Sequence, residues 1–208
     1  PSLNSPSSLN VQIASLTSDV DKNIPQTNFV NDKTFVVIIA NENYQSVAKV
    51  PFAINDGEIF GQYCAQTLGI PKNHIRLVKD ATLNNIKYEV RWLSGIIKAY
   101  KGEAKIIFYY AGHGVPDEAN RSSYLLPIDG NGGDVSTGYR LDDLYQQIGE
   151  LPSKSVTIFI DACFSGTKRE GDMMASARGV AIKAKQGQPV GNMVVFSASQ
   201  ADETAYPY

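Results

Sequence analysis

Two short stretches carry residues that could do nucleophilic chemistry. The stretch VTIFIDACFSG, residues 156–166, begins as an apolar strand and ends with the acid Asp161, the thiol Cys163 and a glycine. The stretch KIIFYYAGHG, residues 105–114, ends with His113 between two glycines. An imidazole beside a thiol can take its proton or stabilise the thiolate, which the unperturbed thiol pKa of about 8.5 otherwise disfavours. The pair predicts acyl transfer, with Cys163 as nucleophile and His113 as base.

The residues around these two side chains suggest how a substrate carbonyl is received. Gly112 and Gly114 have no side chain, so they leave room for a carbonyl group to approach. The backbone N–H groups of Gly114 and Cys163 are candidates for donors to the developing oxyanion. This arrangement requires that two segments far apart in the sequence meet in space.

The elements that would position these segments follow from the hydrophobic pattern. Short β-branched or apolar runs predict strands, and apolar residues at helical spacing predict helices. The strands are expected at residues 34–40, 74–80, 105–114, 156–163 and 193–199, and the helices at 56–69, 82–100 and 141–149. This alternation predicts an α/β fold with a mostly parallel sheet flanked by helices on both faces. In such sheets chemistry takes place at the carboxyl ends of strands, where His113 and Cys163 both lie.

Length and composition limit the classes of protein. With 208 residues and 43% hydrophobic residues the chain can bury one core. Residues 1–33 are rich in Ser, Asn, Asp and Pro and are interpreted as a leader, linker or pro-segment, followed by one domain at 34–208. The polar ending after the last strand predicts that the C-terminal part of that domain lies beyond Tyr208 or on a separate piece.

Charge and hydropathy argue against two kinds of partner. The formal net charge is -2, so no excess of basic residues favours nucleic acid. The longest apolar stretch, Phe35 to Ala40, is far shorter than the roughly 20 residues of a membrane helix, so no membrane partner is expected. No secretory signal is visible, and the compartment stays open. A peptide or protein substrate is compatible with both observations.

The two stretches together resemble a known family. FYYAGHG and IFIDACFSG are similar to the His and Cys boxes of caspase-like cysteine peptidases, and the separation of 163 - 113 = 50 residues, with His first, is the one described for caspases. The Asp-Ala-Cys form resembles metacaspases and their bacterial relatives more than animal caspases. The similarity runs from about Thr34 to Ala205. It implies a caspase-like fold and peptide-bond hydrolysis by a Cys163–His113 dyad that needs no cofactor.

Two acids bear on substrate preference, because animal caspases cleave after Asp and metacaspases after Arg or Lys. Asp161 stands two residues before Cys163, so on an extended strand both side chains would project from one face. The Asn55-Asp56 pair occupies the place of the family's second acidic residue in the S1 pocket, which holds the P1 side chain. Two carboxylates would favour a basic P1 residue. The alternatives are that Asp161 caps a following turn and that Asp56 begins a helix.

The resemblance implies two further properties. A protease that cleaves after basic residues could process itself in the long stretch after Cys163, within which the candidate positions are Lys168, Arg169, Arg178, Lys183 and Lys185. Its own C-terminal fragment would then be a partner. Some metacaspases bind calcium through acids that correspond here to Asp129, Asp142, Asp143 and Glu170, although Asp142 and Asp143 also suit the start of a helix. Calcium is the only cofactor that the sequence suggests.

Several observations keep other interpretations open. Ala111 and Phe164 stand where many metacaspases have Ser and His. A catalytically silent, caspase-like interaction domain is the alternative to an enzyme, and a third reading is a chain that is inactive until a C-terminal piece completes the cleft. Cys64 fits an apolar helix stripe and is predicted to be core, and His74 is predicted to be an ordinary turn residue. Because edge strands can pair, a dimer is left open.

Overall fold

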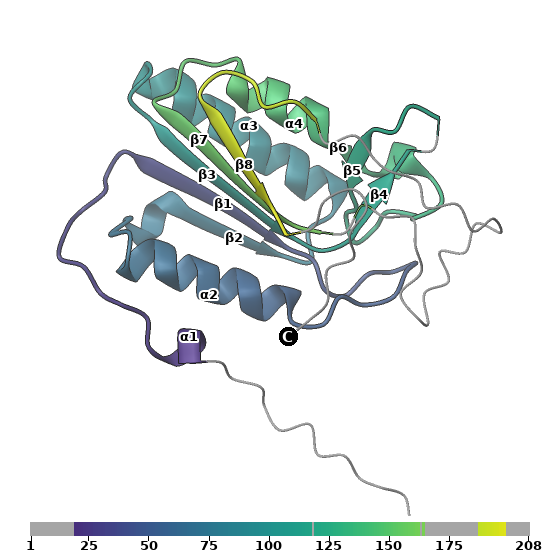
Figure 1. Cartoon of the computed structure of the whole chain (residues 1–208), viewed down its shortest axis with the longest axis horizontal. Coiled ribbons are helices and arrows are strands. Elements are labelled where there is room, and N and C mark those ends of the chain that lie inside the picture. The colour runs from purple at the N-terminus through teal and green to yellow at the C-terminus, as the bar shows by residue number, and fades with distance from the viewer. Residues whose placement is uncertain (1–18, 118, 163, 165–186, 199–208) are drawn as a thin grey trace, which may run out of the picture.

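The structure, a computed structural model, describes residues 19–117, 119–162, 164 and 187–198. Its centre is a five-stranded parallel sheet in the order β2-β1-β3-β7-β8 (Figure 1). The strands are β1 (Thr34–Ala40), β2 (Ile75–Lys79), β3 (Lys105–Ala111), β7 (Ser155–Asp161) and β8 (Met193–Ser197). Helices cover both faces, which confirms the predicted fold class.

The register of the central strands places their carboxyl ends at one level. All seven residues of β1 are buried, as expected for a β-branched strand covered on both faces. β1 pairs with β3 from Thr34 opposite Lys105 to Ala40 opposite Ala111. β3 pairs in turn with β7 up to Ala111 opposite Asp161. The segments that follow these strands therefore start side by side.

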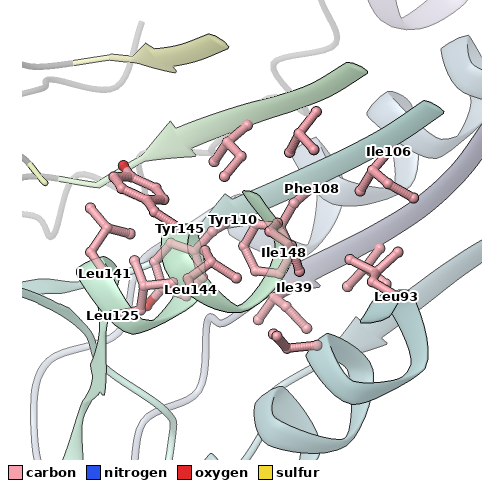
Figure 2. Close-up of a cluster of buried hydrophobic side chains, with 14 of the residues drawn as sticks. Ile39, Leu93, Ile106, Phe108, Tyr110, Leu125, Leu141, Leu144, Tyr145 and Ile148 are labelled. Atoms are coloured by element: carbon pink, nitrogen blue, oxygen red, sulfur yellow. The ribbon is translucent and has the colours of Figure 1, made fainter. Parts of the chain in front are cut away.

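One face of the sheet carries the larger part of the core. It is covered by α3 (Leu83–Tyr100) and α4 (Leu141–Gly149). α3 begins with a capping box between Thr82 and Asn85, which satisfies backbone donors at its start. Figure 2 shows how side chains from both helices meet those of β1 and β3, among them Leu93, Ile148, Ile39 and Phe108. This packing fixes β3 from one side.

The opposite face is covered by α2 (Ala53–Gln66). Cys64 is buried there, as predicted, and Phe60 stacks on Tyr109 with ring centroids 4.4 Å apart. The sequence placed the start of this helix at residue 56. In the structure the helix begins at Ala53. The preceding residue, Phe52, has a left-handed conformation with φ of 72°, which separates the loop from the helix.

A second, antiparallel sheet was not anticipated. It consists of β4 (Gly114–Pro116), β5 (Ser123–Leu125) and β6 (Tyr139–Arg140), and it follows β3 directly. Strands of two or three residues are too short to show an alternating pattern, so they could not be predicted from the sequence. Two short 3-10 helices, η1 (Lys72–His74) and η2 (Val135–Thr137), complete the described elements.

The described part of the N-terminal segment packs along α2. After α1 (Asp19–Lys22), the backbone N–H of Thr27 donates to Gln66 O at 2.8 Å and that of Asn31 donates to Gly69 O at 2.8 Å. These bonds tie residues 27–31 to the C-terminal end of α2. Among the helices of the described residues, none has the length and apolar character needed to cross a membrane.

Candidate active site

His113 lies immediately beyond the carboxyl end of β3. The preceding residue is tied to the neighbouring strand, since the N–H of Gly112 donates to Asp161 O at 3.2 Å. The ring Nε2 of His113 is 2.8 Å from Ala48 O. A carbonyl oxygen only accepts hydrogen bonds, so Nε2 carries the proton in this contact. In the neutral ring, Nδ1 is then the basic nitrogen.

The backbone of His113 is held as firmly as its ring. Its N–H donates to the hydroxyl of Tyr44 at 2.7 Å. Its carbonyl accepts from the N–H of Leu126 at 3.0 Å and from the hydroxyl of Tyr110 at 2.7 Å. The rings of Tyr44 and His113 also lie against each other, with centroids 4.8 Å apart. Every polar atom of the His113 backbone therefore has a protein partner.

The loop that follows β1 supplies two of these contacts, from Tyr44 and Ala48. The loop begins at Asn41, which is fully buried, and whose side-chain oxygen accepts from the N–H of Ala81 at 2.7 Å. The carboxylate of Asp80 accepts from the N–H groups of Glu42 and Asn43 at 2.9 and 2.8 Å. Side chains beyond β2 thus fix the loop that contacts His113.

The hydrogen bonds to Asp80 show in its acidity. Partial burial works to raise the pKa of this carboxyl, but the bonds from Asn43 and Glu42 outweigh it, and the pKa lies below its usual value. Asp80 also has a positive φ of 49°, a conformation that Asp tolerates better than most residues. Asn41 and Asp80 are therefore the supports of the loop.

The two predicted S1 acids come near each other on the α2 side of the sheet. Asp161 ends β7 on the same side as Phe159, which packs with the cluster under α2. Asp56 lies in the first turn of α2. Loss of solvation raises the pKa of Asp56, a hydrogen bond from Asn55 partly offsets this, and the negative charge of Asp161 raises it further.

Tyr109 lies within the electrostatic field of both acids. Burial raises the pKa of its hydroxyl well above the usual value, and the charges of Asp161 and Asp56 add to the shift. The ring of Tyr109 stacks on Phe60, as is usual for a packed strand residue. Its hydroxyl lies near the two acids of the candidate site.

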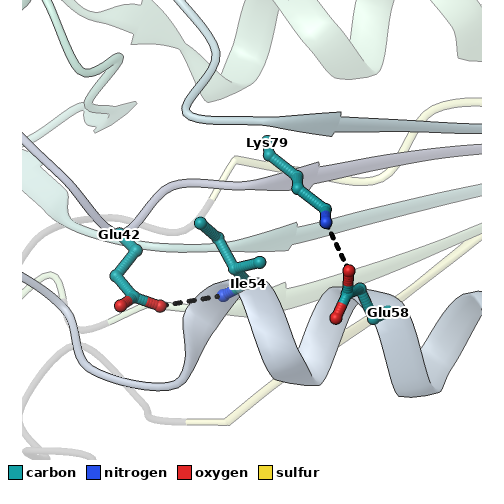
Figure 3. A network of polar contacts seen from close by, with 4 residues as sticks. All are labelled: Glu42, Ile54, Glu58 and Lys79. Carbon is teal, nitrogen blue, oxygen red and sulfur yellow. Dashed lines mark hydrogen bonds and ion pairs between the residues drawn. The ribbon is translucent and has the colours of Figure 1, made fainter.

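Glu42 is a third acid at this end of α2, and it was not predicted from the sequence. Its carboxylate accepts from the N–H of Ile54 at 3.4 Å, at the start of the helix (Figure 3). Its charge also raises the pKa of Asp56. Figure 3 shows that the nearby Glu58 is paired with Lys79 instead. Glu42 and Asp56 therefore both place negative charge at the first turn of α2.

Several predicted residues lie outside the described part of the chain. They are the nucleophile Cys163, the acid Glu170 and the five candidate cleavage positions Lys168, Arg169, Arg178, Lys183 and Lys185. Ala162 and Phe164, on either side of Cys163, are both described and buried. The prediction that the side chains of Asp161 and Cys163 project from one face assumes an extended strand through both residues. β7 ends at Asp161, so this point stays a prediction.

Three of the four predicted calcium ligands, Asp129, Asp142 and Asp143, lie in the described part of the chain, each at the start of a helix. Asp129 accepts from the N–H of Leu83 at 3.0 Å, at the start of α3. Asp142 pairs with Arg140 at 2.9 Å, and it begins α4 together with Asp143. Within the described ranges, no three acidic, His or Cys side chains come together as a metal site would require. With Glu170 outside these ranges, calcium binding stays a prediction.

His113 follows β3, and in the sequence Cys163 follows the adjacent parallel strand β7. Residues 33–207 match the caspase domain family. The chain therefore belongs to the caspase domain family, which is a family of cysteine peptidases. The match agrees with the resemblance drawn from the two sequence boxes.

Two other comparisons are less informative. No curated protein matches the chain. Among solved structures, the crystal structure of a structural-genomics target from Geobacter sulfurreducens is similar, with a TM-score of 0.48 and 21% identity. The similarity covers 63% of this chain and 50% of that one, so the match spans half the length of the solved protein.

Proposed function

We propose that this protein is a cysteine endopeptidase that cleaves peptide bonds after Arg or Lys. The observation that carries the proposal is the fixed His113 at the end of β3. Its Nε2 donates to Ala48 O, and the strand beside it, β7, leads directly to Cys163. A histidine whose ring is oriented through one nitrogen can exchange a proton with a thiol nucleophile through the other.

The proposed reaction has two halves. The Cys163 thiol gives its proton to Nδ1 of His113, and the thiolate forms a bond to the carbonyl carbon of the scissile peptide. The N–H groups of Gly114 and Cys163 donate to the resulting oxyanion. The intermediate collapses as the C–N bond breaks and the imidazolium gives its proton to the leaving amine. Water, deprotonated by His113, then hydrolyses the thioester and restores the thiol.

The S1 pocket is assigned to Asp56 and Asp161. The support is their mutual electrostatic effect, together with the added charge of Glu42, at one end of α2. Like charges that repel one another in the free protein gain by receiving a cation. A guanidinium can donate hydrogen bonds to two carboxylates at once, which makes Arg the best P1 residue and Lys the next.

The test compares peptides that differ only at P1. Fluorogenic peptides ending in Arg, Lys or Asp are incubated with the full chain, once with added calcium and once with a chelator. We expect thiol-dependent turnover with Arg and Lys and none with Asp, and we expect Cys163→Ala and His113→Ala to abolish it. If none of the three peptides is cleaved, the silent interaction domain is favoured. Faster cleavage after Asp would refute the acidic pocket while leaving the peptidase assignment intact.

Self-processing is a further part of the proposal. The basic residues that follow Cys163 match the proposed P1 preference. Mass spectrometry of the purified chain should find cuts after one or more of Lys168, Arg169, Arg178, Lys183 and Lys185. The Cys163→Ala protein should stay intact when incubated alone. If that variant matures to the same fragments in isolation, the cleavage is not its own.

A further inference from the structure

Two tyrosines that play no part in the proposed chemistry surround the backbone of His113. Tyr110 belongs to β3 and is fully buried, and Tyr44 belongs to the loop after β1 and is 9% exposed. Their hydroxyl oxygens are 3.3 Å apart. Tyr44 receives the N–H of His113 at 2.7 Å, and the hydroxyl of Tyr110 lies 2.7 Å from the carbonyl of the same residue. The three groups form a closed ring of hydrogen bonds.

The protons of this ring can be assigned by counting donors. The N–H of His113 can only donate, so the hydroxyl oxygen of Tyr44 accepts. The carbonyl oxygens of His113 and Leu126 can only accept, and they lie 2.7 and 2.9 Å from the hydroxyl of Tyr110, which therefore donates its one proton to these carbonyls. The proton of Tyr44 is then directed to the oxygen of Tyr110, and each hydroxyl proton in the ring is used once. The chain of bonds starts and ends on one residue, His113.

Gly112 explains how two hydroxyl groups reach this backbone. Its φ of 155° lies outside the range that other residues readily adopt. A Cβ atom at this position would collide with the hydroxyl of Tyr44 and would lie 2.8 Å from that of Tyr110. The sequence suggested that this glycine leaves room for a substrate carbonyl. In the structure the space beside it is taken by the two tyrosines.

We propose that Tyr44 and Tyr110 are positioning residues that hold the backbone of His113 in place for proton transfer with Cys163. The inference rests on the proposed role of His113 as the base. Each tyrosine acts through His113: both hydroxyl groups bond to its backbone, and the ring of Tyr44 also lies against its imidazole. Because a misplacement of about 1 Å can cost a large factor in rate, fixing both backbone atoms of the base has catalytic value.

A structural role alone would not require this arrangement. Tyr139 provides the contrast, since it is also buried and its hydroxyl donates to Gln147 Oε1 at 2.7 Å, a bond that joins β6 to α4 and leaves His113 out. At any of the three positions a phenylalanine removes one hydroxyl and keeps the aromatic side chain. Tyr139→Phe is therefore a matched control for Tyr44→Phe and Tyr110→Phe.

The hydrogen-bonded ring should keep its protons throughout an enzyme assay. Burial raises the pKa of Tyr44 to about 12, and the pKa of the fully buried Tyr110 lies well above its usual value. Neither hydroxyl ionises in the range from about pH 5 to about pH 9 in which cysteine peptidases are assayed. Changes in a pH profile over this range therefore report on the Cys163–His113 pair and not on the tyrosines.

The experiment uses the full chain with single substitutions and measures two quantities. The first is kcat and KM on the Arg-terminated peptide. The second is the rate of alkylation of Cys163 by iodoacetamide as a function of pH, followed by mass spectrometry of the peptide that contains it. Cys64 does not interfere, because it is 1% exposed and burial raises its pKa to about 12. Circular dichroism and thermal melting verify that each variant is folded at the assay temperature.

We expect Tyr44→Phe and Tyr110→Phe each to lower kcat about 10-fold with little change in KM, a fraction of the full contribution of a general base. The acid limb of the alkylation profile should move up by about one pH unit, because a displaced imidazolium stabilises the thiolate less. Since both tyrosines belong to one ring, the double variant should lose less than the product of the two single losses. Tyr139→Phe should leave kcat and the profile unchanged.

The outcomes separate this proposal from the one on which it rests. If the two tyrosine variants melt lower but match Tyr139→Phe in kcat and alkylation profile, the tyrosines are structural and the inference is wrong. If Cys163→Ala retains turnover, the peptidase assignment itself fails. A variant that does not fold leaves the decision to the other tyrosine, since either substitution opens the same ring of bonds.

Discussion

Two charged clusters on different parts of the sheet are built in opposite ways. At the β2 edge, Arg76 faces Glu89 of α3, with Nη2 2.9 Å from Oε1 and Nε 2.6 Å from Oε2. The second contact is ionic only, since Oε2 has no hydrogen-bond partner. At the carboxyl end of the sheet, Asp56 and Asp161 carry the same sign, and each is close enough to act on the hydroxyl of Tyr109.

In the first cluster each charge faces a charge of opposite sign. The carboxylate of Glu89 is 6% exposed and Arg76 is 32% exposed at the side chain, and the guanidinium lies over the rings of Tyr88 and Trp92 at 5.3 and 4.8 Å. In the second cluster burial and a like charge both work against ionisation of Asp56. A cluster that is stable by itself supports the fold, whereas one that gains from an added cation is suited to binding.

Removing one charge of the acidic pair tests whether the pair binds a cation. We expect Asp161→Asn to lower kcat/KM for the Arg-terminated peptide about 100-fold, because the amide keeps the shape of the side chain but loses the charge-assisted bonds. Thermal stability should not fall, since a repulsion with Asp56 is also removed. Steady-state kinetics and thermal melting measure the two effects.

Two controls make the result specific. Glu103→Gln removes an acid that pairs with Lys33 at the amino end of β3, and it should leave kcat/KM unchanged. A peptide with an uncharged P1 glutamine should respond to Asp161→Asn by less than about threefold. An equal loss on both peptides would mean that Asp161 supports the active site in general and does not select a cation.

The compensated cluster should respond in the reverse manner. Arg76→Met leaves a buried carboxylate without its partner and should lower the free energy of unfolding by about 3 kcal/mol. Glu89→Gln leaves a partly exposed cation that still has two aromatic rings, and about 1.5 kcal/mol is expected. Replacing both, as in Arg76→Met with Glu89→Leu, should cost less than Arg76→Met alone.

Urea unfolding on a Cys163→Ala background measures these values without interference from self-cleavage. In the active background, kcat/KM per folded molecule should stay within about twofold of the parent. Equal losses for Arg76→Met and Glu89→Gln would show that the exposed fraction of each partner does not decide the cost. A large loss of activity would mean that the β2 edge is coupled to the site.

The same contrast explains how much could be predicted from the sequence. His113, Asp161 and the strands that carry them were visible because each ends or follows a strongly apolar run, whereas Asp56 was selected only through the family resemblance. Asn41, Tyr44 and Asp80 were not, because they contact other parts of the chain through long-range hydrogen bonds that no local period encodes. The pair Arg76–Glu89 is not indicated by the sequence either, since it depends on how β2 packs against α3.

The smallest effect concerns the protonation of Asp56. Its pKa lies above the usual Asp value, so the folded state takes up this proton more readily than the unfolded chain. The stabilising contribution is therefore complete below the unfolded pKa of about 3.9 and is lost as the pH rises through the folded pKa. Cation binding has the opposite dependence, because only the ionised form attracts a basic P1 side chain.

Both dependences can be measured against Asp56→Asn. In urea unfolding on the Cys163→Ala background, the protein with Asp56 should lose stability relative to Asp56→Asn as the pH is raised from about 3 to about 6. In the active background, KM for the Arg-terminated peptide should fall a few-fold over the upper part of the same interval. The KM of Asp56→Asn should vary less with pH. A stability difference that grows in the other direction would mean that Asp56 already has a cationic partner in the free protein, and the acidic cluster would then be compensated like the one at β2.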